Sequence, residues 1–262
     1  MKPGGVNWSK FAGIAPYLSL MSVRSAVLNI VALSQVAMPS AMSGAGMNFE
    51  IFKRYLVTKK VMAAIELCAN AKLDFFLSAV VTRESHGDVD WLLDLARRLG
   101  VMVNFQIPQF NPEMYGPNAK SWMPAPDEVR AILGRITAAK EAGAPVLFSS
   151  RSYRHTIGWK DYAVERVERP GEVSPCTAGK FFLQVEPNGD IYPCVLHIGR
   201  FTPKNVVRDG VEAAWRHAQQ HSCFDCYNTW LNENRAIFDL SPAILTNFWR
   251  NYMHPRPARS AG

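Results

Sequence analysis

The sequence predicts an α/β protein whose sheet is parallel and whose strands are joined by crossover helices. Between residues 59 and 149, amphipathic stretches alternate with short runs that are nearly continuous in apolar residues. This helix–strand alternation favours a parallel sheet, and a chain of 262 residues can bury a good core in one or two domains. Periodicity alone also allows a doubly wound sheet.

Each element of this alternation has its own signal. The first helix places Val61, Ile65 and Cys68 on one face, and the second is stopped by Gly100. Pro126 opens the third helix. The strands are apolar almost throughout, as in sheets that are buried on both faces. We expect helices over 59–70, 90–99 and 126–142, and strands over 74–82, 101–107 and 146–149.

The N-terminal part, residues 1–57, is atypical. From Phe11 to Phe49 its one charged residue is Arg24. The apolar run 25–38 has 14 residues, fewer than the roughly 20 that span a bilayer, so no membrane span is expected. We expect 1–57 to be poorly ordered and assign it no function.

The charge of the chain gives little support to nucleic-acid binding. The formal net charge is +7, but the basic residues are dispersed and no basic run exceeds two residues. A clustered basic face is the usual mark of a nucleic-acid site, so a nucleic-acid partner is not expected.

Four of the five cysteines, Cys176, Cys194, Cys223 and Cys226, fall in the last 87 residues. Cys223-Phe-Asp-Cys226 forms a short knuckle that presents two thiols from one turn. Four thiolates that converge are a complete ligand set for one metal centre. A cytoplasmic location is expected, because an oxidising compartment suits such thiolates poorly.

A hairpin brings the first two cysteines together. Asn188-Gly189 is a favoured pair for a two-residue turn, whose central positions need positive φ. Folding about this pair sets Leu183 opposite Cys194. Cys176 lies upstream on a short link in which Gly179 lets the backbone bend. Cys176 and Cys194 are therefore expected to meet at the open end of the hairpin.

Three interpretations of the four cysteines remain open from the residues alone. Four thiolates suit a [4Fe–4S] cluster, and they also form a tetrahedral zinc site. Zinc sites more often use two short knuckles, whereas 17 residues separate Cys176 from Cys194. Disulfides are a third interpretation, which would leave Cys68 odd. Three nearby histidines, His197, His217 and His221, are expected at the surface because four cysteines already saturate a cubane.

The segment from Cys176 to Cys194, with its Asn-Gly-Asp-Ile-Tyr-Pro-Cys ending, resembles the C-terminal auxiliary-cluster domain of radical SAM enzymes. This domain is called SPASM, or twitch in its shorter form, and the similarity covers about residues 173–235. The resemblance implies that Cys176, Cys194, Cys223 and Cys226 bind one auxiliary [4Fe–4S] cluster, which binds substrate or transfers electrons. It also implies a partial (β/α) barrel of the radical SAM type over 58–170 and a twitch-like unit with a hairpin and a C-terminal helix over 171–262.

The chain departs from that family at the site that cleaves SAM. The Cys-x-x-x-Cys-x-x-Cys motif is absent, and Cys68 is the one cysteine before position 176. We therefore expect a truncated relative that does not cleave SAM on its own, SAM being the cofactor of a complete homologue. We also expect a peptide or small molecule as substrate, and a protein partner that completes the barrel.

Overall fold

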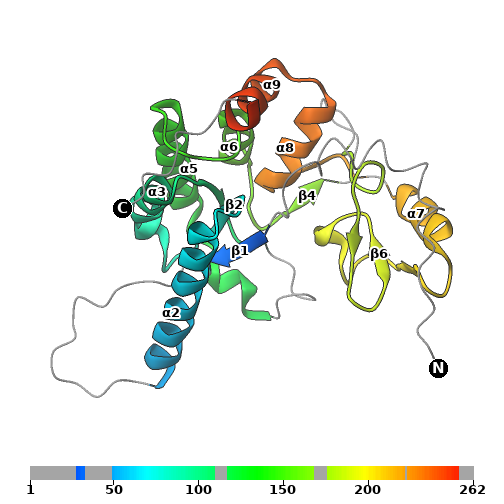
Figure 1. The fold of residues 1–262 in the computed structure, drawn as a ribbon. Helices are drawn as coiled ribbons and strands as arrows, with labels where there is room; N and C mark the ends of the chain where they lie inside the picture. Colours follow the sequence, from blue (N-terminus) through cyan, green and yellow to red (C-terminus); the bar gives the residue numbers. More distant parts are fainter. Residues whose placement is uncertain (1–27, 33–48, 110–116, 168–175, 222, 254–262) are drawn as a thin grey trace.

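The computed structural model describes residues 28–32, 49–109, 117–167, 176–221 and 223–253. Three parallel strands form its larger sheet in the order β1-β2-β3: Leu28–Ala32, Phe75–Val80 and Met102–Gln106 (Figure 1). The predicted α/β class and the parallel pairing are confirmed. The strand expected at 146–149 is reduced to an isolated parallel bridge between Val103 and Val146.

Four helices join or follow these strands: α2 over Phe49–Asn70, α3 over Val89–Leu99, α5 over Pro126–Glu141 and α6 over Ser150–Ile157. The second and third expected helices are confirmed within one residue at each end. Helix α6 was not predicted. It begins directly after the bridge, where the Ser149 hydroxyl accepts a hydrogen bond from the backbone N–H of Ser152, as an N-cap does.

One helix runs across the boundary expected at residue 57. Helix α2 begins at Phe49, and β1 lies inside the segment that was expected to be poorly ordered. The strand uses the apolar run of the N-terminal part, because pairing with β2 satisfies its backbone groups. The other residues of this segment, 1–27 and 33–48, lie outside the described part of the chain.

The main core lies between the sheet and helices α3 and α5. Along β2 the side chains alternate, with Phe75, Leu77 and Ala79 buried, which is the two-residue period of a strand. Phe105 of β3 is fully buried, and its backbone N–H donates to the Tyr153 hydroxyl of α6 at 3.2 Å. Burial in turn raises the pKa of the Tyr153 hydroxyl, so it remains protonated.

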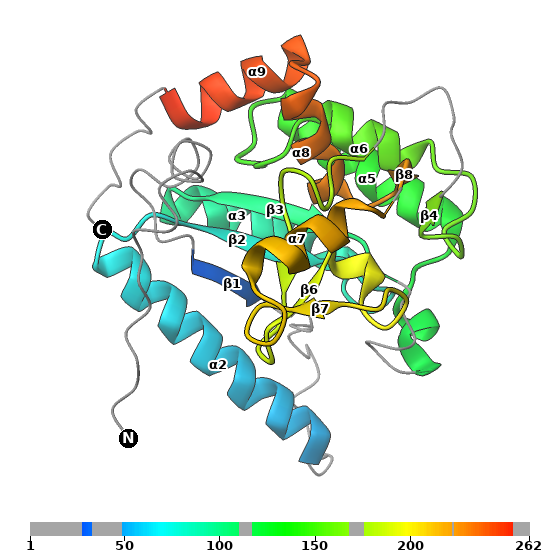
Figure 2. The same cartoon turned by 90° about the vertical axis from the view of Figure 1, so that its right-hand side faces the viewer.

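A smaller unit lies to one side of this core (Figures 1 and 2). Its antiparallel sheet contains β5, β6 and β7, which are Gln184–Val185, Asp190–Tyr192 and Lys204–Asn205. Helix α7, Val211–Gln219, packs on β6 and β7.

The hairpin between β5 and β6 differs by one residue from the predicted register. Val185 pairs with Ile191 and Gln184 with Tyr192, so Leu183 does not lie opposite Cys194. The loop has three residues rather than two, because Gly189 donates its N–H to the Glu186 carbonyl at 2.8 Å and takes a φ of 87°. This is the geometry of a type I turn followed by a left-handed glycine, and Pro187 suits its first central position.

The chain then returns to the larger unit. Strand β8, Asp225–Cys226, pairs with β4, Arg166–Val167, and helix α8, Thr229–Phe238, packs against α6. Helix α9, Pro242–Phe248, and the π-helical turn Trp249–Met253 end the described part. Short 3₁₀ turns lie at His86–Asp88, Pro117–Trp122 and Val195–His197. The two units are therefore interlocked across the boundary expected at 170.

A buried carboxylate strengthens this interlock. Glu233 of α8 accepts hydrogen bonds from the Ser149 hydroxyl at 2.7 Å, the Ser152 hydroxyl at 2.6 Å and the Ser149 backbone N–H at 3.0 Å. These donors lie at the N-terminus of α6, where a negative charge is favoured by the helix dipole. Asn247 of α9 donates to the same carboxylate at 3.0 Å. Glu233 thus fastens α8 and α9 to α6.

No helix in the described segments is both long enough and apolar enough to span a membrane.

Candidate metal centre

The four cysteines singled out in the sequence meet where the smaller unit joins β8 and α8. Cys176, Cys194, Cys223 and Cys226 are 9%, 3%, 7% and 4% exposed and belong to one buried group with Ala178, Leu196 and Leu231. We call these four residues the thiol cluster. All are free thiols, as is Cys68, which packs at the edge of the main core instead. Cys68 therefore lies in a different buried group from the other four cysteines, as the sequence predicts.

The segment that carries Cys176 contacts the backbone of the knuckle and the backbone of helix α7. Its N–H donates to the Cys223 carbonyl at 2.9 Å. Three residues on, Gly179 takes a φ of 78°, and a Cβ there would lie 2.7 Å from the Ala218 carbonyl oxygen of α7. The Gly179 carbonyl also accepts from the Trp215 indole at 2.9 Å. A glycine is required here, because any larger residue would clash with the helix backbone and strain its own.

Cys194 lies two residues after the end of β6 and directly before the 3₁₀ turn Val195–His197. Its carbonyl accepts from the backbone N–H of His197 at 3.1 Å, which opens the 3₁₀ turn. The turn brings Leu196 into the same buried group as the thiols. The hairpin therefore delivers Cys194 to the cluster even though its register differs from the predicted one.

The knuckle is braced by side chains from outside it. Arg235 of α8 donates to the Phe224 carbonyl at 3.1 Å and to the Asp225 carboxylate at 2.9 Å. His155 Nε2 of α6 lies 3.0 Å from the same carboxylate. Burial opposes the charge on Asp225, but His155 and Arg235 outweigh it and hold the pKa of the carboxyl below its ordinary value. Asn232 closes the brace by donating to the Cys226 carbonyl at 2.7 Å.

The neighbouring thiols shift each other's pKa values. The side chain of Cys223 lowers the pKa of Cys176 to about 6, and Cys176 in turn raises the pKa of Cys223. Burial raises the pKa of Cys194 to about 12 and that of Cys226 well above its ordinary value. Three of the four thiols therefore keep their protons near neutral pH when nothing else is bound.

Arginine side chains partly offset the effect of burial, which disfavours the thiolate forms. The charge of Arg235 favours the thiolate of Cys176, and that of Arg166 favours the thiolate of Cys194. An anionic group bound to the thiol cluster would lie in the field of both cations.

The buried polar atoms without a hydrogen-bond partner in the described parts of the chain include the Thr177 hydroxyl and His197 Nε2. The prediction that His197 lies at the surface is wrong: the side chain is 1% exposed and its ring lies 3.9 Å from that of His221. Burial, and then the charge of His221, lowers the pKa of His197 to about 3, so its imidazole is neutral. His217 and His221 are partly exposed.

The thiols do not yet surround a common centre. Among the described residues, no group of three or more His, Cys, Asp or Glu side chains is arranged to hold a metal ion as it stands. Binding of one metal centre by all four cysteines would therefore require their side chains to turn.

Sequence reasoning missed the residues that brace the site, namely Arg235 and His155. The polar run after the knuckle could have indicated these braces, because its polar residues lie in one helix or at its cap. They are Asn228, Asn232, Glu233 and Arg235. Asn228 accepts from the Leu231 N–H at 3.0 Å as an N-cap, and the others bind the knuckle or α6. The run is therefore structural.

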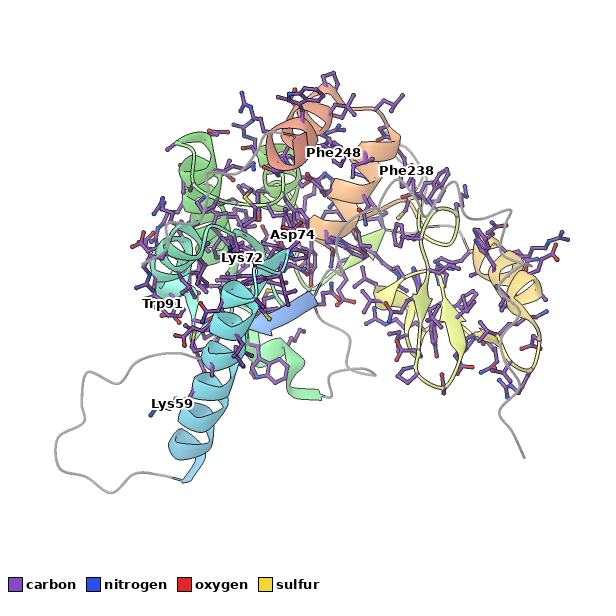
Figure 3. All side chains as sticks on the ribbon, viewed as in Figure 1. Lys59, Lys72, Asp74, Trp91, Phe238 and Phe248 are labelled. Atoms are coloured by element: carbon purple, nitrogen blue, oxygen red, sulfur yellow. The ribbon has the colours of Figure 1, made fainter. Side chains whose placement is uncertain are left out.

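An apolar surface lies beside the thiol cluster. Phe182 packs on the cluster and meets Trp230 edge to face, with ring centroids 5.8 Å apart. Phe181 stacks on Phe238, with centroids 4.2 Å apart, and the two side chains are 54% and 45% exposed. Figure 3 shows Phe238 at the end of α8 and Phe248 on α9.

Compared with known proteins, the sequence matches no protein-family model, and no curated protein matches it.

Proposed function

We propose that the thiol cluster binds one [4Fe–4S] cluster and that the chain is an auxiliary-cluster protein of the radical SAM and SPASM/twitch type. The observation that carries this proposal is the convergence of four free, buried cysteines from three separate segments. Buried cysteines without a partner are usually small apolar side chains, but four of them together form a complete set of ligands.

The surroundings of the cysteines fit a bound cluster. A cubane held by four thiolates is anionic, and Arg235 and Arg166 supply positive charge at Cys176 and Cys194. Hydrogen bonds to the sulfurs of such a cluster tune its reduction potential. The unpartnered Thr177 hydroxyl and His197 Nε2 are available as donors.

The proposed role is electron transfer or substrate binding beside the cluster. When bound, an iron–sulfur cluster supplies one-electron chemistry. The protein contributes the four ligands, a site largely closed to water, and the braced knuckle. The apolar surface of Phe181, Phe182, Trp230 and Phe238 is where a peptide or small molecule would contact this unit. The same proposal includes the fold of the larger unit: β1–β3 and their helices would form a partial radical SAM barrel.

The test is metal analysis of the full chain after anaerobic reconstitution with iron and sulfide. We expect about four iron and four sulfide per chain, with broad visible absorption that bleaches on reduction. Cys223→Ala and Cys226→Ala should abolish iron binding and destabilise the smaller unit, since metal binding is coupled to folding. Cys68→Ala is the matched control and should retain full iron content. One zinc per chain without sulfide, in colourless anaerobically purified protein, would show a structural zinc site instead.

A further inference from the structure

The turn between β5 and β6 contains the one Asn-Gly pair of the sequence, Asn188-Gly189. In such a pair the backbone nitrogen of the glycine can attack the side-chain amide carbon of the asparagine. Glycine permits this reaction better than other residues, because it has no side chain to hinder the approach and its backbone rotates freely. Asn188 is exposed to solvent, so water can reach the product of such an attack.

The folded turn holds both reacting groups in hydrogen bonds. The Gly189 N–H donates to the Glu186 carbonyl at 2.8 Å. The Asn188 side chain is held by Asp190: its amide nitrogen donates to the Asp190 carboxylate at 2.8 Å, and its oxygen accepts from the Asp190 backbone N–H at 3.0 Å. The nucleophilic nitrogen is therefore occupied as a donor, and the amide that it would attack is bound to a different residue.

Asn205 of β7 fixes the turn from the neighbouring strand. Its side chain is 5% exposed, and its amide nitrogen donates to the Asn188 carbonyl at 2.8 Å and to the Asp190 carboxylate at 2.9 Å. We call these two hydrogen bonds the turn clamp. The Gly189 carbonyl also accepts from the Val206 N–H at 2.8 Å. Rotation of the Asn188-Gly189 backbone toward an attacking geometry would break these bonds.

We propose that Asn188 is a latent deamidation site, which the turn clamp keeps unreactive while the smaller unit is folded. When the turn opens, the Gly189 nitrogen attacks the Asn188 Cγ and a carbon–nitrogen bond forms. The bond from Cγ to the side-chain nitrogen breaks, and that nitrogen leaves with the Gly189 proton as ammonia. Solvent water then opens the cyclic imide at either carbonyl and gives aspartate or isoaspartate. One water is consumed and one ammonia is released, and no atom is oxidised or reduced.

The product would not fit the folded turn. An aspartate at position 188 has no donor for the Asp190 carboxylate that Asn188 now binds, and two neighbouring carboxylates repel each other. An isoaspartate adds one atom to the backbone and shifts the carbonyl that Asn205 binds. Opening of the turn would therefore leave a permanent chemical mark on the hairpin. No metal takes part in this reaction, so the site is independent of the proposed cluster.

The test is mass spectrometry of the peptide that contains Asn188, after incubation of the full chain at mildly alkaline pH. We expect deamidation to be slower in buffer than in urea that unfolds the chain, on the order of tenfold or more, because the reaction requires local opening. Asn205→Ala removes the turn clamp and should speed the reaction in buffer. The matched control is Val207→Ala, which shortens a side chain that is 84% exposed on the same loop and should react at the rate of the unaltered chain.

Equal rates in buffer and in urea would overturn the proposal. A folded Asn205→Ala chain that reacts no faster than Val207→Ala would overturn it as well. If circular dichroism shows that Asn205→Ala does not fold, the comparison of buffer with urea in the unaltered chain decides. Asn188→Asp supplies one product directly and should lower the urea midpoint. An unchanged midpoint would contradict the expected loss of the contact with Asp190.

Discussion

At the scale of single residues, Lys140 shows how burial changes a charge. Its ammonium group donates to the Val146 carbonyl at 2.6 Å, close to the junction that Glu233 fastens. Burial lowers the pKa of Lys140 to about 8, although the Glu233 charge works in the opposite direction. The charged form is therefore less stable in the folded chain than in the unfolded one.

This shift predicts a rise in stability with pH. Because the folded pKa lies below the ordinary value of 10.5, the unfolded chain binds more protons between about pH 8 and 10.5, and stability increases over that window. The full gain is up to about 3 kcal/mol. Urea unfolding at a series of pH values should show it in the unaltered chain. Lys140→Met should lack this component, and parallel curves for the two proteins would contradict the prediction.

At the scale of elements, the end of helix α8 is strained. Leu240 follows the C-cap residue Asp239 and takes a φ of 51°, a left-handed conformation that suits glycine and disfavours a residue with a Cβ. Its side chain is 69% exposed, so little burial compensates for the strain.

Leu240→Gly should therefore stabilise the chain, by about 0.5–1 kcal/mol. Chemical denaturation should show a higher midpoint with an unchanged slope. The matched control is Leu245→Gly, which removes a similar exposed side chain from inside α9, where glycine should destabilise by about 1 kcal/mol. Equal effects at both positions would show that the backbone conformation of Leu240 is not responsible.

The sequence pattern predicts some of these helices and strands and not others. Periodicity and stop signals were sufficient for α3, α5, β2 and β3, because each carries its own apolar pattern. Helix α6 was missed because its sequence is polar and it is held by tertiary contacts from Glu233. The hairpin was placed correctly, but its register was not, because Pro187 adds a third loop residue that the Asn-Gly pair does not indicate.

For the candidate site, spacing predicted that the four cysteines would come together, and the structure places them in one group. The burial of His197 and the braces from His155 and Arg235 could not be predicted. These depend on contacts between residues ten or more positions apart, such as the 3.1 Å hydrogen bond from Arg235 to the Phe224 carbonyl. A local pattern carries no information on such contacts.

At the scale of the whole molecule, the proposed ligand set predicts which reaction is excluded. Reductive cleavage of SAM needs a cluster iron with an open coordination position. Four cysteine ligands leave none open, and the described segments of the chain contain no second group of this kind. The reconstituted chain with SAM and dithionite should therefore form no 5′-deoxyadenosine above a protein-free control, as measured by chromatography. Cleavage that is lost in Cys176→Ala would show that the thiol cluster itself performs this chemistry.

The pairing of β4 with β8 restricts where recombination between genes could join the two units without breaking contacts. A crossover placed in the connection at 168–175 would separate Arg166–Val167 from Asp225–Cys226, and Glu233 from Ser149 and Ser152. The acquired unit would keep its cysteines but would arrive without the strand and the helix terminus that hold Cys226 and α8. The heritable unit is therefore longer than the cysteine-bearing segment, and it extends back to the start of α6.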